Sequence, residues 1–398
     1  MMRGHPPGPG VSYRSMRRRW FTLLALVTAC RGERRSAAAA RPAPPDTTRP
    51  VETVNLYAPA AAGLLSPRAA AARPLVYVPN SHDGTVTVID PRTYHVLRTF
   101  PTGALPQHVV PAYDLSTLWV ANNLGNTLTP IDPATGREGQ NVPVSDPYNL
   151  YFTPDGRFAI VVAERRRQLD FRDARTMALV QAVPVQCKGV DHMEFTADGR
   201  FAIATCEFSG QLLKLDLESR AVTGYLTLDP GGLDTTAMPQ DIRSSPDGRV
   251  FYVADMKANG VFLVDPAAFR RIGFIATGKG THGIYPSRDG RLMYITNRGW
   301  NTTAGGRRGP GSITVLDPVT EHIVATWPVP GGGSPDMGNV TADGTELWVS
   351  GRYDDEVYVF DTRTGRLTHR ITVGREPHGL CVWPQPGRYS LGHTGNMR

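Results

Sequence analysis

The chain has 398 residues, a net charge of +7 and 40% hydrophobic residues. No apolar run approaches the ~20 residues of a membrane-spanning helix, so we expect a body that does not cross a membrane. The length exceeds what one ordinary hydrophobic core supports and favours a repeat architecture. Residues 1–41 hold nine arginines and one glutamate, a net +8, which leaves −1 for residues 42–398. The main part of the chain therefore lacks the excess positive charge typical of nucleic-acid binding, and we expect no nucleic-acid partner.

Residues 1–29 have the pattern of a bacterial export signal, in which Arg17-Arg18-Arg19 precedes a short apolar stretch. The ending Val27-Thr28-Ala29-Cys30 resembles a lipobox. It predicts that Cys30 is lipidated and that the protein lies in the cell envelope, on the periplasmic or surface side, with this lipid as its only membrane attachment. The alternative is an ordinary secretion signal and a secreted protein. Met16 is a second candidate for the true start.

Residues 30–73 are rich in Ala, Pro, Arg and Thr and show no apolar periodicity. Such a composition cannot bury enough apolar surface to fold, so this segment is predicted to be a disordered tether.

Seven apolar strands that each end in an aspartate recur through the rest of the chain. Their spacings of 42, 41, 43, 49, 52 and 44 residues match the length of four short strands with their turns, the period of a β-propeller blade. The prediction is an all-β, seven-bladed propeller of four-stranded antiparallel blades over residues 74–384, followed by a tail, 385–398, without strand pattern. The aspartates are Asp90, Asp132, Asp173, Asp216, Asp265, Asp317 and Asp361.

The repeat is clearest in residues 281–328. Asp289-Gly290 predicts a tight hairpin, and Tyr294-Ile295-Thr296-Asn297 predicts the second strand of the blade. Together with Tyr252-Val253-Ala254-Asp255, this motif resembles the YVTN-repeat (YncE-like) β-propeller family, over residues 74 to about 384. The resemblance implies the fold and says little about activity, since similar propellers host lactonases, lyases and amine dehydrogenase heavy chains.

The first repeat begins directly with a second strand, Leu75–Val78. The missing first strand is found at the far end, in Pro377–Val382, which has no second strand after it. We therefore expect the two ends of the propeller to pair and close the ring.

The strand directions assign the loops to two faces. The Asp-Gly and Asp-Pro turns share one face, here called the plain face. The loops between second and third strands and the links between blades share the other, here called the loop face, with enlarged connections at 229–238, 299–311 and 330–335. Binding usually uses variable loops on a rigid scaffold, so the loop face is the predicted functional surface.

The innermost strands begin at this face, where polar residues gather around the mouth of the central channel. The predicted ligand-binding residues are His108, Asn149, Asp191, His192, Asp241, His282, Asp336, His378, Glu207, Asp255, Asn297 and Arg298.

Four of these residues, His108, His192, His282 and His378, form a candidate metal site, which would take a divalent transition-metal ion as cofactor. The alternative is that the histidines only bond neighbouring blades. His108 and His192 lie six residues before the aspartate of the hairpin that follows them, Asp114 and Asp198, whereas His282 lies seven before Asp289. Strand alternation therefore predicts that His282 points in a different direction from His108 and His192.

Cys187 and Cys206 are predicted to come close together, because the hairpin around Asp198-Gly199 places Cys206 opposite Asp191. Export permits a disulfide between them. Two separate thiols, or two metal ligands, are the alternatives. Cys381 lies in the closing strand and is predicted to be core.

Two functions follow from these observations. The first is a non-catalytic envelope module that presents its loop face to a protein, a glycan or a small ligand. The second is a metal-dependent enzyme or redox partner, for example a lactonase-like hydrolase, with His192 and Asp241 as an acid/base pair. The first is the function we infer from the sequence.

Overall fold

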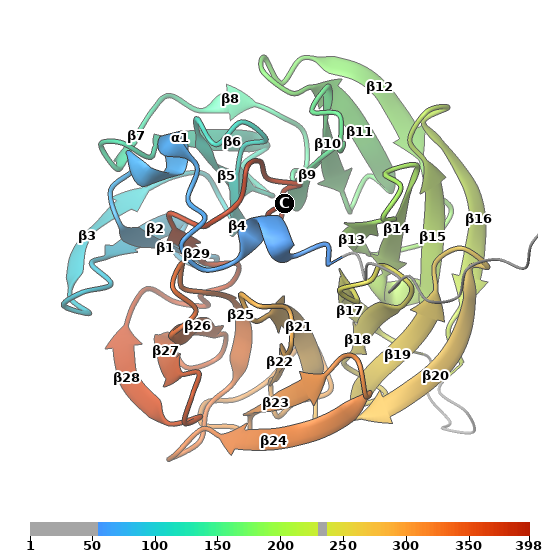
Figure 1. Cartoon of the computed structure of the whole chain (residues 1–398). Coiled ribbons are helices and arrows are strands. Elements are labelled where there is room, and N and C mark those ends of the chain that lie inside the picture. Colours follow the sequence, from blue (N-terminus) through green and yellow to red (C-terminus); the bar gives the residue numbers. More distant parts are fainter. Residues whose placement is uncertain (1–54, 230–236) are drawn as a thin grey trace, which may run out of the picture. The chain divides into compact units, whose positions relative to one another are not determined.

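A computed structural model describes residues 55–229 and 237–398 of the chain. Seven antiparallel sheets stand around a central channel, and Figure 1 shows them as a closed ring. The seven-bladed propeller predicted from the aspartate spacing is therefore confirmed. No helix in the described ranges is long and apolar enough to span a membrane.

Each blade is one sheet, and its strands run outward from the channel in chain order, except in blade 1. Blade 1 contains β29 (Cys381–Trp383), β1 (Leu75–Asn80), β2 (Thr85–Ile89) and β3 (Val96–Pro101). Blade 2 contains β4 (Pro106–Pro111), β5 (Leu118–Asn122), β6 (Thr127–Asp132), β7 (Arg137–Glu138) and β8 (Val142–Pro143). Blade 3 contains β9 (Asn149–Phe152), β10 (Phe158–Ala163), β11 (Gln168–Asp173) and β12 (Leu179–Pro184). Blade 4 contains β13 (Val190–Phe195), β14 (Phe201–Cys206), β15 (Gln211–Asp216) and β16 (Ala221–Thr227).

The remaining blades follow the same order. Blade 5 contains β17 (Pro239–Ser244), β18 (Phe251–Asp255), β19 (Gly260–Asp265) and β20 (Arg270–Ala276). Blade 6 contains β21 (Thr281–Pro286), β22 (Met293–Asn297), β23 (Ser312–Asp317) and β24 (His322–Pro328). Blade 7 contains β25 (Pro335–Val340), β26 (Glu346–Gly351), β27 (Glu356–Asp361) and β28 (Leu367–Thr372). The short helices are η1 (Ala58–Ala60), α1 (Pro67–Ala70) and η2 (Glu207–Ser209).

Blade 2 departs from the predicted four strands because its outermost strand is divided. β7 and β8 both pair with β6, and residues 139–141 separate them.

Both ends of the propeller meet in blade 1, as predicted. β29 pairs antiparallel with β1, and Leu75, Val76 and Tyr77 lie opposite Trp383, Val382 and Cys381. This pairing gives blade 1 its innermost strand and joins the last blade to the first. No sheet of the ring is left with an open edge at the junction.

The aspartates that mark the repeats cap the turns after the third strands. Asp173 Oδ1, for example, accepts hydrogen bonds from the backbone N–H groups of Arg175 and Thr176. Asp361 does the same with Arg363 and Thr364. They define the repeat and lie away from the channel.

The prediction that the tether extends to residue 73 is wrong for residues 55–73. These residues form η1 and α1, and the side chains of Tyr57, Ala60 and Ala69 are buried. The Tyr57 hydroxyl donates to the carbonyl of Ser244 at 2.6 Å. The small alanine side chains pack closely against the core, which composition alone does not reveal.

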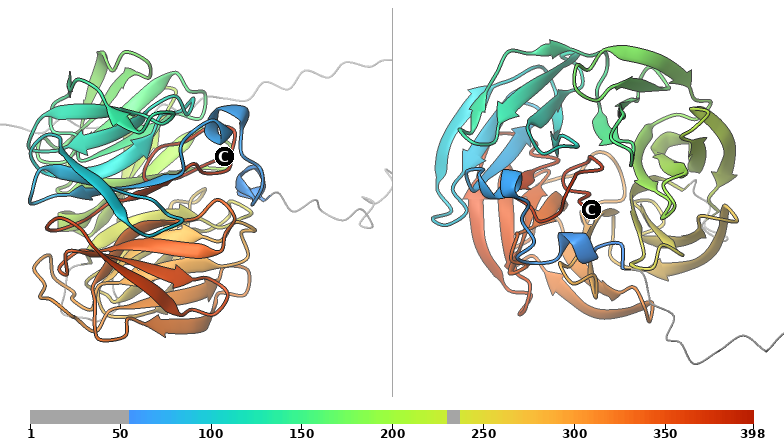
Figure 2. Two further views of the ribbon diagram at one scale, coloured as in Figure 1. Left: turned by 90° about the vertical axis from the view of Figure 1, so that its left-hand side faces the viewer. Right: turned by 45° about the horizontal axis from the view of Figure 1, so that its top comes forward.

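The C-terminal tail, residues 385–398, fills the channel from the plain face. Leu391 and His393 hydrogen-bond the channel edge of β9, through Phe152 N–H to Leu391 O at 3.0 Å and His393 N–H to Leu150 O at 2.8 Å. Figure 2 shows η1, α1 and the C-terminus on the same face of the ring. Both terminal segments therefore cover the plain face.

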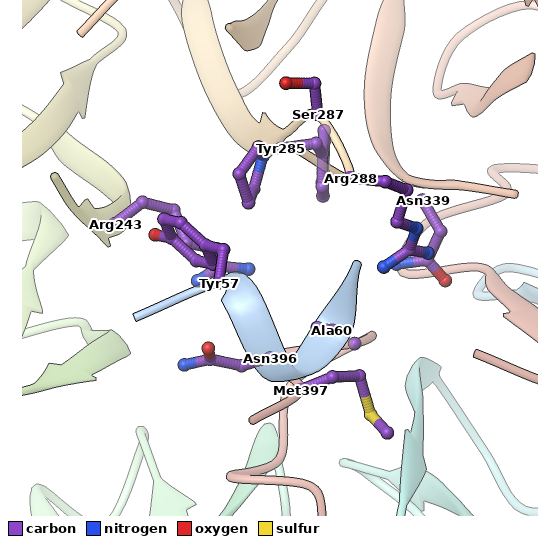
Figure 3. Close-up of a pocket in the computed structure, with 11 residues that line it drawn as sticks. Tyr57, Ala60, Arg243, Tyr285, Ser287, Arg288, Asn339, Asn396 and Met397 are labelled. Atoms are coloured by element: carbon purple, nitrogen blue, oxygen red, sulfur yellow. The ribbon is translucent and has the colours of Figure 1, made fainter. Parts of the chain in front are cut away.

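A small cavity of about 30 Å³ remains beneath these segments, between η1, the tail and the inner strands of blades 5 to 7 (Figure 3). Tyr57, Arg243, Tyr285, Asn339 and Asn396 are among the residues that line it. This volume holds a water or two and no organic ligand. A larger open hollow of about 300 Å³ lies between blades 3 and 4, but lining residues such as Asp155 use their polar groups within their own turns.

Candidate functional site at the loop-face mouth of the channel

Most inner strands begin with a β-bulge at the loop face. The register shifts by a residue in β4, β13, β17, β21 and β25, as at Val190/Met193, where Asp191 and His192 together oppose a single residue of β14. A bulge re-aims side chains that strict alternation would send to opposite sides. Two consecutive polar residues can therefore both face the channel.

The prediction that His108 and His192 point away from His282 is wrong for this reason. The ring of His108 lies 5.4 Å from that of His192 and 4.8 Å from that of His378, measured between centroids. His282 lies 6.0 Å from His378. All four predicted histidines thus belong to one buried cluster.

A fifth histidine joins this cluster from the tail. The ring of His393 stacks on that of His192 with centroids 4.7 Å apart and lies 5.3 Å from that of His108. Sequence reasoning missed His393 as a site residue because residues 388–398 show no strand pattern. Only the pairing of the tail with β9 brings it into the channel.

Burial keeps these histidines neutral. Desolvation lowers the pKa of His378 to about 4 although Asp336 partly offsets it, and it holds the pKa values of His108, His192, His282 and His393 well below the ordinary range. The cluster is therefore uncharged at neutral pH and offers free ring nitrogens.

Three buried carboxylates of the channel each have an arginine. Asp336 binds Arg298 at 2.6 Å and accepts from His378 Nδ1 at 2.6 Å. Asp241 binds Arg243 at 3.0 Å. In blade 4 Glu194 binds Arg398, the last residue of the tail, at 3.0 Å. Arg243 lies two residues after Asp241 on the same strand, so alternation could have predicted that pair.

Asp191 is the exception among these channel carboxylates. It is 2% exposed, and neither of its oxygens makes a hydrogen bond of good geometry with the described residues. The Tyr148 hydroxyl approaches it closely enough to lower its pKa in part, and His192 Nε2 lies 3.1 Å from its Oδ1 without hydrogen-bond geometry. A buried carboxylate in this state must hold a proton or meet a cation.

Two further carboxyl groups, Glu164 and Glu207, lie near Asp191 at the mouth of the channel, around the half-buried Tyr148. Burial, together with Glu207 and Asp146, raises the pKa of Glu164 to about 7. Burial also raises the pKa of Glu207, against the opposing effect of Gln240 and Arg298. The pKa of Asp191 is raised well above its usual range by burial and then by Glu207 and Glu164. We call Asp191, Glu164, Glu207 and Tyr148 the acidic mouth.

Two of the predicted site residues do not face the mouth. Asn297 is fully buried within blade 6, where its amide donates to Ser312 and Thr314 of the third strand. Asp255 accepts the backbone N–H groups of Met238 and Ala258, and burial raises its pKa to about 6. Both are structural links at the ends of second strands.

The other predicted residues lie along the channel. Asn149 contacts His192 Nδ1 through its amide nitrogen at 3.2 Å, and its oxygen accepts the N–H of Leu150 at 2.8 Å. Arg298 reaches across from the end of β22 to Asp336. Sequence reasoning did not single out Tyr151, whose hydroxyl also approaches His192 Nδ1 at 3.4 Å.

Cys187 and Cys206 form a disulfide beside the acidic mouth, with Cα atoms 5.9 Å apart. The bulge in β13 places Val190, and not Asp191, opposite Cys206. The bond fixes the end of β14, from which Glu207 follows directly. Cys381 is a free thiol in the core, and burial raises its pKa.

The export signal and the lipidation site Cys30 lie outside the described residues, as does most of the enlarged connection 229–238. The connection 299–311 packs on blade 7, where Arg308 binds Glu356 at 2.8 Å.

Fold and channel together define a seven-bladed β-propeller whose channel is closed at the plain face and polar at the loop face. The sequence profile of the YncE-like β-propeller family matches residues 52–387, and the chain belongs to this family. No curated protein sequence matches it.

Many solved structures share the fold, among them the following three. The Kuenenia stuttgartiensis hydrazine synthase is 17% identical, with a TM-score of 0.57 over 69% of this chain and 88% of that one. The dihydro-heme d1 dehydrogenase NirN is 17% identical, with a TM-score of 0.58 over 81% of this chain and 77% of that one. A putative 6-phosphogluconolactonase from Bacteroides uniformis is 16% identical, with a TM-score of 0.61 over 77% of this chain and 98% of that one. At such identities the likeness concerns the fold alone.

Proposed function

We propose that this chain is a binding propeller whose acidic mouth takes a small ligand that carries an ammonium group. The observation that supports it best is Asp191, a buried carboxyl group whose oxygens both lack a hydrogen bond of good geometry in the described structure. Its neighbours in the channel, Asp241 and Asp336, each have an arginine. A cationic ligand would give Asp191 the positive charge that the arginines give to Asp241 and Asp336.

The surrounding groups suit an ammonium ion. Glu164 and Glu207 add negative charge once they ionise, and the Tyr148 ring adds an aromatic face of the kind that attracts cations. Without a ligand, the raised pKa values mean that protons occupy part of this site. A bound cation would displace them, since it stabilises the ionised carboxylates.

The lactonase-like alternative is less well supported. His192 and Asp241, the acid/base pair it would use, are both fully buried below the mouth. Asp191 is buried as well, but Tyr148 and Glu207 beside it are only partly buried.

Calorimetric titration of the purified protein at pH 8 with 1,4-diaminobutane tests the proposal, with the neutral 1,4-butanediol as the matched ligand. We expect saturable binding of the diamine alone. Asp191→Asn should weaken it by about tenfold or more, since one charge-assisted contact is worth about 1.5–3 kcal/mol. Glu218→Gln, an exposed glutamate of the same blade, is the matched control and should bind as the parent does.

Equal binding of diamine and diol, or full binding by Asp191→Asn, would overturn the proposal. If Asp191→Asn does not fold, Glu164→Gln provides the same test from the rim of the mouth.

We also propose that the protein acts in the bacterial envelope, attached through Cys30. This rests on the lipobox-like sequence alone. Mass analysis of the N-terminal peptide from native membranes should show a lipid-modified Cys30, and a chain cleaved elsewhere or unmodified would refute it.

A further inference from the structure

We propose that His192, Asp241 and His393 form a binding site for a transition-metal ion of the zinc class, completed only when the C-terminal tail is docked. Each residue offers one ligand atom, and these atoms all lie within 4.8 Å of one another. This site adjoins the ammonium site at the mouth, since His192 Nε2 lies 3.1 Å from Asp191, but its ligands are other residues.

The donor set suits zinc. Two imidazole nitrogens and one carboxylate oxygen are ligands that Zn²⁺ takes in tetrahedral sites. His393 Nε2 lies 3.3 Å from Asp241 Oδ1, close to the separation of two ligand atoms that share a tetrahedral ion at bond lengths of about 2.0–2.1 Å. The rings of His192 and His393 are stacked, and the angle between their planes is 20°.

Unpartnered polar atoms point to a missing ligand. Within the described ranges, Nε2 of both His192 and His393 lacks a hydrogen-bond partner although both rings are fully buried. Both nitrogens of His108 are unpartnered too, and its ring lies 5.3 Å from that of His393. The ring nitrogens of His108 lie outside the set of ligand atoms within 4.8 Å of one another, so this residue borders the site without completing it.

The ligands are held from behind, as metal ligands usually are. His393 Nδ1 accepts the backbone N–H of Thr394 at 2.5 Å, which fixes the ring. Binding of an ion at Nε2 requires Nδ1 to carry the proton instead and to donate it to Thr394 Oγ1, 3.0 Å away. The backbone N–H groups of Ile242 and Ile284 donate to the two oxygens of Asp241 at 2.9 Å.

Charge at the site permits a cation. Arg243 compensates part of the charge of Asp241, but Asp191 lies 3.1 Å from His192 Nε2 and has no arginine of its own. A bound ion would gain this second carboxylate as a near neighbour. Because His393 comes from the tail while His192 and Asp241 come from β13 and β17, the ion would link the tail to two blades.

The experiment uses the purified protein, stripped of metal with a chelator and titrated with Co²⁺ as a spectroscopic substitute for Zn²⁺. We expect one Co²⁺ per chain with the strong visible absorption of a tetrahedral N/O site. Zn²⁺ should displace it and slow the removal of the tail by carboxypeptidase. His393→Ala should weaken Co²⁺ binding at least tenfold, since it removes a ligand.

His393→Ala leaves the anchor between Arg398 and Glu194 in place, so the tail should still dock, and near-ultraviolet circular dichroism checks this. His322→Ala, on the exposed outer strand β24, is the matched control and should bind Co²⁺ as the parent does. Absence of a stoichiometric tetrahedral spectrum, or its retention in His393→Ala, would overturn the proposal. Asp191→Asn should lose the diamine and keep a Co²⁺ site, so the two proposals fail separately.

Discussion

Arg398 Nη2 lies 3.0 Å from Glu194 Oε1, and this ion pair ties the last residue of the chain to the inner strand β13. Glu194 is fully buried, and it also accepts the Asn396 amide at 3.1 Å and its neighbour's backbone N–H, that of Phe195, at 2.9 Å. The guanidinium of Arg398 stacks on the ring of Tyr57. Both terminal segments are thus anchored at one carboxylate on the plain face of the channel.

Arg398→Ala should destabilise the protein by about 3 kcal/mol or more, because it leaves the carboxylate of Glu194 buried without its counter-ion. Chemical denaturation measures the change, and faster digestion of the tail by carboxypeptidase should accompany it. Arg388→Ala, an exposed arginine of the same tail, should have little effect. Equal effects of the two substitutions would show that the ion pair does not hold the tail.

The closing strand should contribute as much to stability as a strand inside a blade. Trp383 of β29 is 1% exposed, and Trp348 of β26 is fully buried. Trp383→Ala and Trp348→Ala should each cost about 3–5 kcal/mol, since both remove a large core side chain. A much smaller cost for Trp383→Ala, measured by the same denaturation, would mean that β29 detaches before the ring unfolds.

Glu164 should make stability depend on pH. Its pKa is about 7 in the fold against 4.5 for the ordinary group, so the folded state binds more protons between these values, and stability falls as the pH rises from 4.5 to 7. Glu164→Gln should therefore stabilise the protein at pH 8, by about 1–3 kcal/mol, and change little at pH 5.

Thermal unfolding at the two pH values checks this, with the exposed Glu218→Gln as the control. A gain at pH 5 as large as that at pH 8 would show that ionisation of the buried Glu164 is not the cause.

The disulfide should be detectable by mass spectrometry after alkylation, and it should contribute to the free energy of unfolding. Alkylation of the denatured, unreduced protein should label Cys381 but not Cys187 or Cys206, and reduction should expose both. Cys187→Ala with Cys206→Ala should cost about 3 kcal/mol, because the bond closes a loop of sequence separation 19. Labelling of all three thiols without reduction would contradict the bond.

The propeller could be predicted from sequence because each blade repeats the same local signals. The aspartate after the third strand recurs every 41 to 52 residues and the Asp-Gly hairpin recurs with it, and the unpaired strands at the two ends imply ring closure. These features depend on short stretches of sequence, so a single sequence is enough to predict the fold.

The site could be predicted only in part. The polar starts of the inner strands, such as Asp191 and His192, mark the mouth, but a bulge in most of these strands decides where the side chains point. His393 and Arg398 reach the channel through long-range pairing with β9 and Glu194, which leaves no local pattern. Asn297 looks like a mouth residue and is used inside its blade, because its amide meets Ser312 and Thr314 there.

The central claim is that the acidic mouth holds protons which a cationic ligand displaces. Its most direct test is calorimetric titration of the protein with 1,4-diaminobutane at pH 7, repeated in two buffers of different ionisation enthalpy. We predict the release of about one proton per bound diamine. The pKa of Glu164 is about 7 and that of Asp191 is raised, and a bound cation lowers both pKa values. Binding with the same heat in both buffers, and hence without proton release, would contradict it.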